Sequence, residues 1–262
     1  MFEYYNRSME NENDKWKVTT ERFVGFFDIM GFKDKVMSNS HEDIVSMIEN
    51  LKNAKTATID GRWGNVKQQT NLKSFLFSDS FFIFSASDSP WDLLNLLHNS
   101  KILLNYCFSQ KIPLKGAISF GNATANFDRS IFVGQPIIDA YLLHEELDMF
   151  GAILDHNAER KLNELLADED FNDEVPYEAI QYKVPTKNGR INHYCINWPE
   201  ILFHKDNGGT YLLKDRRNLE SFYTTVSGKP RMYVDNTIDF FDFLLEKVKK
   251  DYPDILEYPR KH

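Results

Sequence analysis

The sequence predicts an α+β fold in which helices pack on a mainly antiparallel sheet. Apolar runs of strand length alternate with segments of helix-like apolar spacing. Two short β-rich runs are separated by only three polar residues, as in an antiparallel hairpin. The 262 residues are 42% hydrophobic and 14% aromatic, enough to bury a full core. We therefore expect one folded domain with a small elaboration.

The first predicted element is a strand over residues 22–29. It is apolar on both faces, which is typical of a central strand in a covered sheet. Gly31 then frees the backbone for a turn. Residues 33–53 show the apolar spacing of a helix, with Ser40 as a candidate cap. Residues 56–70 are polar and are expected to form a loop or a weak hairpin arm.

A hairpin follows. The β-rich runs Leu72–Phe77 and Phe81–Ser85 are joined across Ser78-Asp79-Ser80, which predicts a tight turn with the aspartate at its tip. Pro90 then starts a long helix, along which leucines recur at helical spacing.

The second half of the chain continues with shorter elements. They are a strand over Pro113–Gly121, a helix that follows Gly134-Gln135-Pro136 within 131–149, a strand over Ala152–Leu154, a helix over Asn157–Leu166, strands over Tyr182–Val184 and Asn192–Ile196, and a last helix over Thr237–Lys249. Residues 167–181 are acidic and are expected to form a loop. The order strand, helices, hairpin, helix, strand, helix, strand describes a ferredoxin-like sheet.

The chain divides into three segments. Residues 1–20 are a polar N-terminal tail, residues 21–166 form the core, and residues 167–262 are a C-terminal elaboration of the same domain, with a hairpin and the final helix. The tail lacks the apolar centre of a signal peptide, and no stretch reaches the length of a membrane span. We expect a cytoplasmic protein that does not bind a membrane.

Charge and cysteine content narrow the function. The net charge of -8 argues against nucleic-acid binding, which uses clustered Lys and Arg. A small anionic substrate stays compatible with this charge, because a bound metal ion can outweigh the global field. The two cysteines cannot form a disulfide framework or a Cys-rich zinc site.

Two aspartates, Asp28 and Asp79, each end or interrupt an apolar run. A charged carboxylate at the edge of a core is costly unless a cation or hydrogen-bond donors compensate it. In the predicted order of elements, the end of the first strand and the hairpin tip are neighbours, so the two carboxylates would face each other. Such a pair suits Mg²⁺ or Mn²⁺. For either aspartate alone, a structural cap is the competing interpretation.

Four segments carry a further pattern. They are Phe26-Phe27-Asp28-Ile29-Met30-Gly31-Phe32, Phe77-Ser78-Asp79-Ser80, Leu114-Lys115-Gly116-Ala117-Ile118-Ser119-Phe120-Gly121 and Phe132-Val133-Gly134-Gln135-Pro136. In order and spacing they resemble motifs of the class III nucleotidyl cyclases: the two metal motifs, the Arg-Gly-Gly-Ile strand with Lys115 in place of Arg, and the lead into the last active-site helix. The resemblance covers residues 22–160.

The resemblance implies a palm-type fold, with residues 21–166 as the cyclase catalytic core. It also implies a homodimer with active sites at the subunit interface and two divalent cations, Mn²⁺ or Mg²⁺. The reaction would cyclise a nucleoside triphosphate and release pyrophosphate. By the same resemblance, Asp28 and Asp79 hold both ions, and the carbonyl of Ile29 supplies a further ligand.

Several positions depart from the family pattern. Purine cyclases carry a base-reading Lys four residues before the second metal aspartate, where this chain has Phe75, and their second base-reading position is Ile131 here. The family's last helix carries Asn and Arg four residues apart, but this chain has Ile138 and Leu142. Shifting the frame by one gives Asp139 and Leu143, which does not restore the pair. Another cation must then stabilise the developing charge, and four candidates stay open: Lys33, Lys73, Lys115 and Arg129.

An apolar pocket formed by Phe75, Phe23 and Phe32 would suit a small base by stacking. Purine edge groups would go unpaired there. This pattern resembles the bacterial Pycsar cyclases, which make cyclic UMP or cyclic CMP for anti-phage defence. The resemblance implies a pyrimidine nucleotide cyclase, UTP favoured over CTP, with a separate effector that senses the product.

Two alternatives stay open. One is a cyclase-like module that binds a nucleotide without turnover, and the other is an adenylate or guanylate cyclase with unusual base contacts.

The acidic residues Glu145, Glu146 and Asp148 are interpreted as a solvated helix face.

Overall fold

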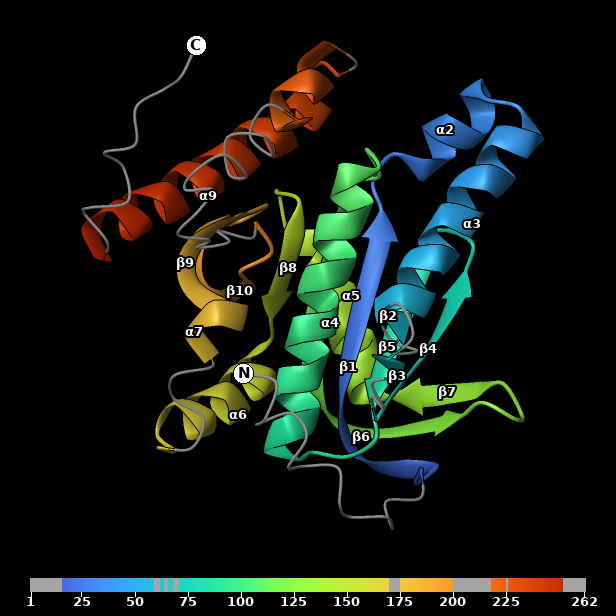
Figure 1. Cartoon of the computed structure of the whole chain (residues 1–262), viewed down its shortest axis with the longest axis vertical. Coiled ribbons are helices and arrows are strands. Elements are labelled where there is room, and N and C mark those ends of the chain that lie inside the picture. Colours follow the sequence, from blue (N-terminus) through green and yellow to red (C-terminus); the bar gives the residue numbers. More distant parts are fainter. Residues whose placement is uncertain are drawn as a thin grey trace.

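The structure is a computed structural model, and it describes residues 16–58, 62–63, 66–67, 71–169, 175–199, 218–224 and 226–251 (Figure 1). The strands in this part of the chain are β1 Thr19–Ile29, β2 Arg62–Trp63, β3 Val66–Lys67, β4 Leu72–Phe77, β5 Ser80–Ser85, β6 Leu114–Asn126, β7 Ile131–Gly134, β8 Gly151–Leu154, β9 Ala179–Thr186 and β10 Gly189–Ile196. The helices are α2 Phe32–Ser38, α3 His41–Thr58, α4 Pro90–Ser109, α5 Gln135–Glu146, α6 His156–Leu166, α7 Val175–Glu178 and α9 Lys229–Asp251, with a 3-10 turn at Phe222–Thr224.

An eight-stranded sheet forms the centre of the fold. The strand order is β4-β5-β1-β6-β8-β10-β9, with β7 paired to β6. Within this sheet, the described neighbouring strands pair antiparallel except β6 and β8, which run parallel. The prediction of an α+β fold with helices on a mainly antiparallel sheet is confirmed.

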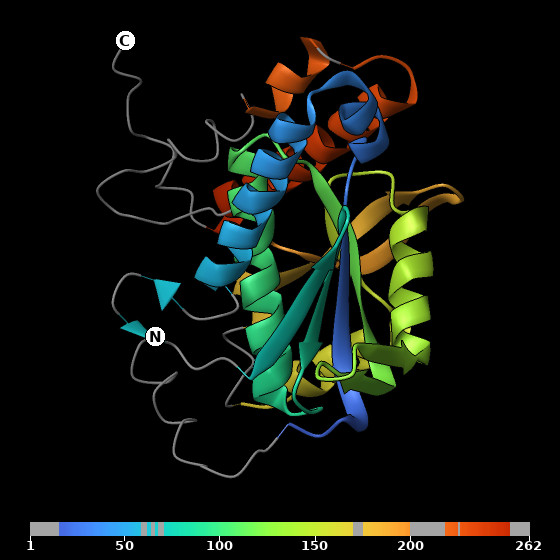
Figure 2. The same ribbon diagram turned by 90° about the vertical axis from the view of Figure 1, so that its right-hand side faces the viewer.

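Helices cover the two faces of the sheet unequally. Seen edge-on, α3 and α4 lie on one face and α5 lies on the other (Figure 2). The main core lies between the sheet and α4, and Phe27 and Leu96 belong to it. The α5 face carries a smaller cluster around Val24 and Phe84. One face of the sheet therefore holds most of the core, and the other carries a thinner aromatic layer.

Strand β1 is central, as its apolar character on both faces predicts. It pairs with β5 on one side and with β6 on the other. It begins at Thr19, before the predicted start at residue 22, and Thr19 pairs with Thr124 of β6. Side chains alternate between the faces, so Phe27 packs in the main core while Asp28 lies on the α5 face.

The helix predicted over 33–53 is two helices. α2 ends at Ser38 and α3 begins at His41. Ser40 and Asp43 form a reciprocal cap, because the Ser40 hydroxyl accepts from the Asp43 amide at 3.1 Å and the Asp43 carboxylate accepts from the Ser40 amide at 3.3 Å. Such a cap starts a new helix, so the candidate cap at Ser40 is confirmed.

Three other predicted boundaries were wrong. β6 continues to Asn126, past the predicted end at Gly121, because it pairs with β7, which was not predicted. The expected loop 167–181 contains α7 and the start of β9, and its residues 170–174 lie outside the described part of the chain. α9 begins at Lys229, eight residues before the predicted Thr237.

Gly134, between β7 and α5, is expected to be intolerant of a side chain. Its φ is +154°, and a Cβ atom would lie 2.7 Å from the Asn122 carbonyl oxygen and 2.8 Å from the Ala123 Cα. We expect Gly134→Ala to lower the free energy of unfolding by about 2–3 kcal/mol in urea titrations. Gly121→Ala is the control, since its Cβ would meet Pro136 at an ordinary 3.4 Å, and an equal loss in both variants would contradict this account.

Candidate active site

Asp28 lies near the end of β1, where three strands meet. Its register partners are Ser80 of β5 and Lys115 of β6. Directly opposed residues of antiparallel strands share a face, so all three side chains lie on the α5 face of the sheet. The Ser80 hydroxyl points to the Asp28 carboxylate, with 3.4 Å between Oγ and Oδ1.

Asp79 reaches the same place from the hairpin tip. β4 and β5 are joined by the two residues Ser78 and Asp79, and Ser78 takes a left-handed φ of 56° to make the turn. The Ile29 amide donates to the Asp79 carbonyl at 3.2 Å, so the tip is bonded to the residue after Asp28. The hairpin and its tip aspartate were predicted correctly, and the structure brings Asp79 beside Asp28.

The electrostatics of Asp28 show that its negative charge is poorly compensated. Burial, followed by the negative charge of Asp79, raises the pKa of Asp28 to about 6. The Ser80 hydrogen bond and the charge of Lys115 act in the opposite direction, and Glu145 adds to the rise. A divalent cation at this place would remove the repulsion between the two carboxylates.

The available donors fit a cation that also binds a substrate. Among the described residues, no group of three or more His, Cys, Asp and Glu side chains could hold a metal ion. Two carboxylates with substrate phosphates are nevertheless a common arrangement for Mg²⁺. The Ile29 side chain is 1% exposed in the core on the other face, so this residue could contribute only its backbone carbonyl.

Of the four candidate cations, Lys115 lies nearest to Asp28 in register. Its side chain is 6% exposed, and its ammonium donates to the Leu147 carbonyl at 3.3 Å. Burial lowers its pKa, an effect that the charge of Glu145 opposes. Lys73 instead lies over the Trp16 ring at 4.6 Å. Lys33 and Arg129 are exposed on α2 and on the β6–β7 turn.

Phe75 is on the same face of the sheet as Asp28, in the neighbouring row of side chains. It pairs with Phe82 in register and stacks on it, with ring centroids 4.7 Å apart and planes at 9°. Phe132 of β7 stacks on Phe75 at 4.3 Å. Phe77, which pairs with Ser80, is 75% exposed and lies in the same row as Asp28. The sequence had not singled out Phe77.

The other two residues that the sequence predicted for the base pocket, Phe23 and Phe32, do not lie beside Phe75 on the α5 face. Phe23 is 1% exposed and packs against Phe120 in the main core, with 4.8 Å between ring centroids. Phe32, at the start of α2, also packs on the main core. The structure therefore brings Phe75 to the face of Asp28 but places Phe23 on the opposite face.

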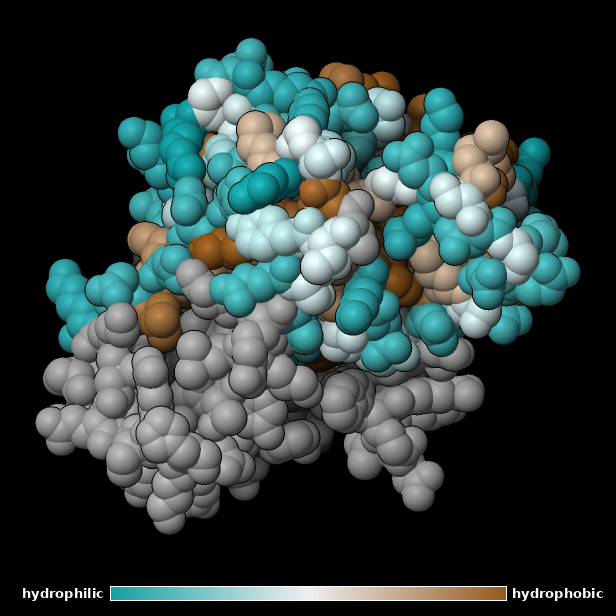
Figure 3. Space-filling view, turned by 90° about the horizontal axis from the view of Figure 1, so that it is seen from above, coloured by the Kyte–Doolittle hydropathy of each residue, from teal (hydrophilic) through white to brown (hydrophobic). Residues whose placement is uncertain are grey.

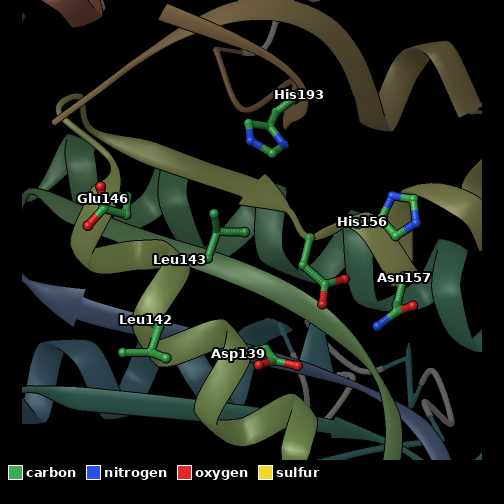
Figure 4. A pocket seen from close by; sticks show the side chains of 8 residues that line it. Asp139, Leu142, Leu143, Glu146, His156, Asn157 and His193 are labelled. Atoms are coloured by element: carbon green, nitrogen blue, oxygen red, sulfur yellow. The ribbon is translucent and has the colours of Figure 1, made fainter. Parts of the chain in front are cut away.

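The positions of the missing Asn and Arg lie on the outer face of α5. Ile138 and Leu142 are 53% and 55% exposed, and Tyr141 between them is 47% exposed. Asp139 and Leu143, together with Leu142, line a hollow of about 420 Å³ (Figure 4). This hollow is lined by Asp139, Leu142, Leu143, Glu146, Asp155, His156, Asn157 and His193. Asp28 and Asp79 are not among its lining residues.

Some residues around the site were missed from sequence. Asp148 is 6% exposed, so its interpretation as part of a solvated face was wrong. It lies after the end of α5, where its amide donates to the Pro185 carbonyl at 3.0 Å. Tyr233 of α9 lies with its ring 5.5 Å from the Lys115 ammonium. A Leu-Asp-Met-Phe run after a helix was the one signal that the chain turns inward there.

Among the described residues seen in Figure 3, hydrophilic side chains prevail, with smaller hydrophobic areas between them. In the described part of the chain, every helix is too short or too polar to cross a bilayer.

Comparisons with known proteins give a limited result. No protein-family model matches the chain, and no curated protein matches it in sequence. One similar solved structure is the catalytic core of a rhodopsin-guanylyl cyclase with converted specificity, in complex with ATPαS: 14% identity over 69% of this chain and 98% of that chain, TM-score 0.44. Another is the structure of a bacterial light-regulated adenylyl cyclase. It is 9% identical, the match covers 78% of this chain and 98% of that chain, and the TM-score is 0.44. A third is a class III adenylyl cyclase-like ATP-binding protein from Pseudomonas aeruginosa. It is 12% identical, the match covers 58% of this chain and 37% of that chain, and the TM-score is 0.38.

Proposed function

We propose that this chain is a metal-dependent nucleotidyl cyclase. It converts a pyrimidine nucleoside triphosphate, UTP in preference to CTP, into the 3′,5′-cyclic monophosphate and pyrophosphate. The product is a second messenger of anti-phage defence, made in the cytoplasm and sensed by a separate effector protein. The observation that carries the proposal is the meeting of Asp28 and Asp79 at the ends of adjacent strands, within segments that resemble both metal motifs of the class III cyclases.

The residues have separate roles in this reaction. Bound divalent cations, Mn²⁺ or Mg²⁺, would activate the ribose 3′-hydroxyl and neutralise charge on the departing pyrophosphate. Asp28, Asp79 and the Ile29 carbonyl would hold them. Lys115 is the candidate cation for the negative charge that develops on the α-phosphate, since it is the register partner of Asp28.

The preference for pyrimidines rests on what surrounds Phe75. Its neighbours are the aromatic rings of Phe82 and Phe132, so this part of the site presents ring faces and edges instead of a polar base reader. The second base-reading position, Ile131, is apolar and 42% exposed. Adenine and guanine carry several edge donors and acceptors that would lose hydrogen bonds here, whereas a smaller ring loses fewer.

The direct test is incubation of the purified protein with each of the four NTPs and Mn²⁺, followed by mass spectrometry of the products. We expect cyclic UMP as the main product, with less cyclic CMP and equimolar pyrophosphate. Cyclic product from ATP or GTP alone would contradict the pyrimidine assignment and favour an adenylate or guanylate cyclase.

A homodimer would use the outer face of α5 and β7. Exposed apolar residues gather there: Ile131 and Val133 on β7, and Ile138, Tyr141 and Leu142 on α5. We expect Leu142→Asp to shift the protein to monomers in light scattering and to remove cyclase activity, since a charge would be buried at the contact. Ile191→Asp, at a 46% exposed position on β10, is the control. A dimer that tolerates Leu142→Asp would place the interface elsewhere.

One observation favours a second candidate, a module that binds nucleotide without turnover. Ile138 and Leu142 offer no polar group where the family's Asn and Arg would act. Tight NTP binding with no product under any metal would support this candidate, and Asp28→Ala would then change affinity alone.

A further inference from the structure

We propose that Tyr233 of α9 is a positioning residue that holds the Lys115 ammonium on the α5 face of the sheet. The C-terminal helix would thereby be part of the candidate active site. The chemical role of Lys115 rests on the proposed function, whereas the contacts of Lys115 and Tyr233 do not depend on it.

Lys115 is confined at its charged end. Its ammonium has the Leu147 carbonyl at 3.3 Å on one side and the Tyr233 ring at 5.5 Å on another. The charges of Glu145, Asp148 and Asp28 act on it as well. A lysine side chain has four flexible torsions, so its charge occupies one place only where several contacts fix it.

Tyr233 is itself fixed. Its side chain is 8% exposed, and its ring lies nearly parallel to that of Phe150, with centroids 6.2 Å apart. Burial, together with the charge of Asp148 and a hydrogen bond to it, raises the pKa of Tyr233 to about 12. The phenol is therefore uncharged at neutral pH, and the Lys115 ammonium lies over the face of its ring.

The segment that follows α5 connects these contacts to the rest of α9. Asn236 donates to the Asp148 carbonyl at 2.7 Å, and the Thr237 hydroxyl accepts from the Phe150 amide at 2.9 Å. The same segment supplies the Leu147 carbonyl to Lys115. In Figure 1, α9 lies at the end of the sheet where β1 terminates. The helix and the segment together enclose the Lys115 ammonium.

A matched pair of tyrosines makes the proposal testable. Tyr223 also donates its hydroxyl to a carboxylate, that of Asp235, and also lies beside a cation, with Arg231 over its ring at 5.1 Å. It has no contact with Lys115 in the described part of the chain. Tyr233→Leu and Tyr223→Leu therefore each remove a ring beside a cation, and only the first concerns Lys115; Tyr223 is the more exposed of the two tyrosines.

The full chain is labelled with acetic anhydride, and the acetylation rate of Lys115 is compared with that of exposed Lys183 by peptide mass spectrometry. We expect Tyr233→Leu to raise the relative rate at Lys115 roughly tenfold, and Tyr223→Leu to leave it unchanged. Tyr233→Phe, which keeps the ring, should protect Lys115 more than Tyr233→Leu. If Tyr233→Leu does not fold, Tyr233→Met takes its place.

Cyclase kinetics give the second readout. With UTP, Tyr233→Leu should lower kcat roughly tenfold while KM changes less than about twofold. An unchanged Lys115 acetylation rate in folded Tyr233→Leu overturns the proposal, whatever the activity. A wild-type protein that forms no cyclic nucleotide overturns the proposed function, and the labelling result still decides whether Tyr233 holds Lys115.

Discussion

Asp28→Asn is expected to abolish cyclisation and to stabilise the metal-free protein at neutral pH. Asparagine keeps the shape of the side chain but removes the charge that would hold the cations, so kcat should fall by at least about a thousandfold. The same charge is poorly compensated in the metal-free site, because burial and Asp79 raise the pKa of Asp28 to about 6. One substitution should therefore move activity and stability in opposite directions.

The stability effect depends on pH in a defined sense. The folded pKa of Asp28, about 6, lies above the ordinary value of 3.8, so the folded state binds its proton more tightly than the unfolded state does. Ionisation of Asp28 then destabilises the fold increasingly as the pH rises from about 4 to about 6, and fully above that. After allowance for solvent screening, Asp28→Asn should gain about 2 kcal/mol at pH 8 and progressively less toward pH 4.

Urea unfolding of the metal-free variants at pH 5 and pH 8 measures this effect. Asp34→Asn, at an exposed position in the first turn of α2, is the matched control and should change neither stability nor activity. Mn²⁺ should stabilise the wild type but not Asp28→Asn. Equal stability of Asp28→Asn and wild type at pH 8, with full activity, would contradict a cation site at Asp28.

Lys115→Met is expected to have the second-largest effect. It removes the one candidate cation that is a register partner of Asp28, so kcat should fall about a hundredfold. The binding of Mn²⁺ should become several-fold tighter, because a positive charge beside the carboxylates is gone. Isothermal titration in the absence of nucleotide measures the affinity for Mn²⁺ separately from turnover.

Opposite changes in turnover and metal affinity identify a charge effect. General damage to the site would weaken Mn²⁺ binding and turnover together. Lys115→Arg, which restores the positive charge, should recover most of the activity. Lys183→Met, at an exposed position of β9, is the control. Normal turnover in Lys115→Met would contradict this role and would mean that another group stabilises the negative charge that develops on the α-phosphate.

The meeting of Asp28 and Asp79 could be predicted because its signals are local. Each aspartate follows an apolar strand, and a two-residue turn places Asp79 at the hairpin tip. Antiparallel pairing of β1 with β5 then brings the tip to Asp28 without any contact that must be guessed. Ser40 was predictable for the same reason, since its cap partner is three residues away.

The surroundings of the three phenylalanines expected to stack on a base were harder to predict, although the error at Phe23 was avoidable. Phe23 and Asp28 are five positions apart on a regular strand, and alternation puts an odd separation on opposite faces. Strand β7 was missed because its apolar residues are few and half-exposed, and its pairing with the end of β6 is what forms it. Phe132, which stacks on Phe75, comes from that strand.

The surroundings of Lys115 could not be predicted from spacing. Tyr233 and Asp148 reach Lys115 through the packing of α9 on the segment after α5, a contact between parts of the chain far apart in sequence. Asp148 follows two glutamates and looks like one more exposed acid, but the chain turns inward after Glu146 and buries it. The burial of Asp148 depends on the tertiary fold, so it could not be predicted from the local sequence.

The most direct test of the central claim is a crystal structure with Mn²⁺ and a non-cyclisable UTP analogue, with data collected at the manganese absorption edge. We predict an anomalous peak within about 2.3 Å of carboxylate oxygens from both Asp28 and Asp79. The triphosphate of the analogue should contact the same ion on the side that the two carboxylates leave open. Manganese bound elsewhere, with the two carboxylates sharing no ion, would contradict the claim that they form one metal site.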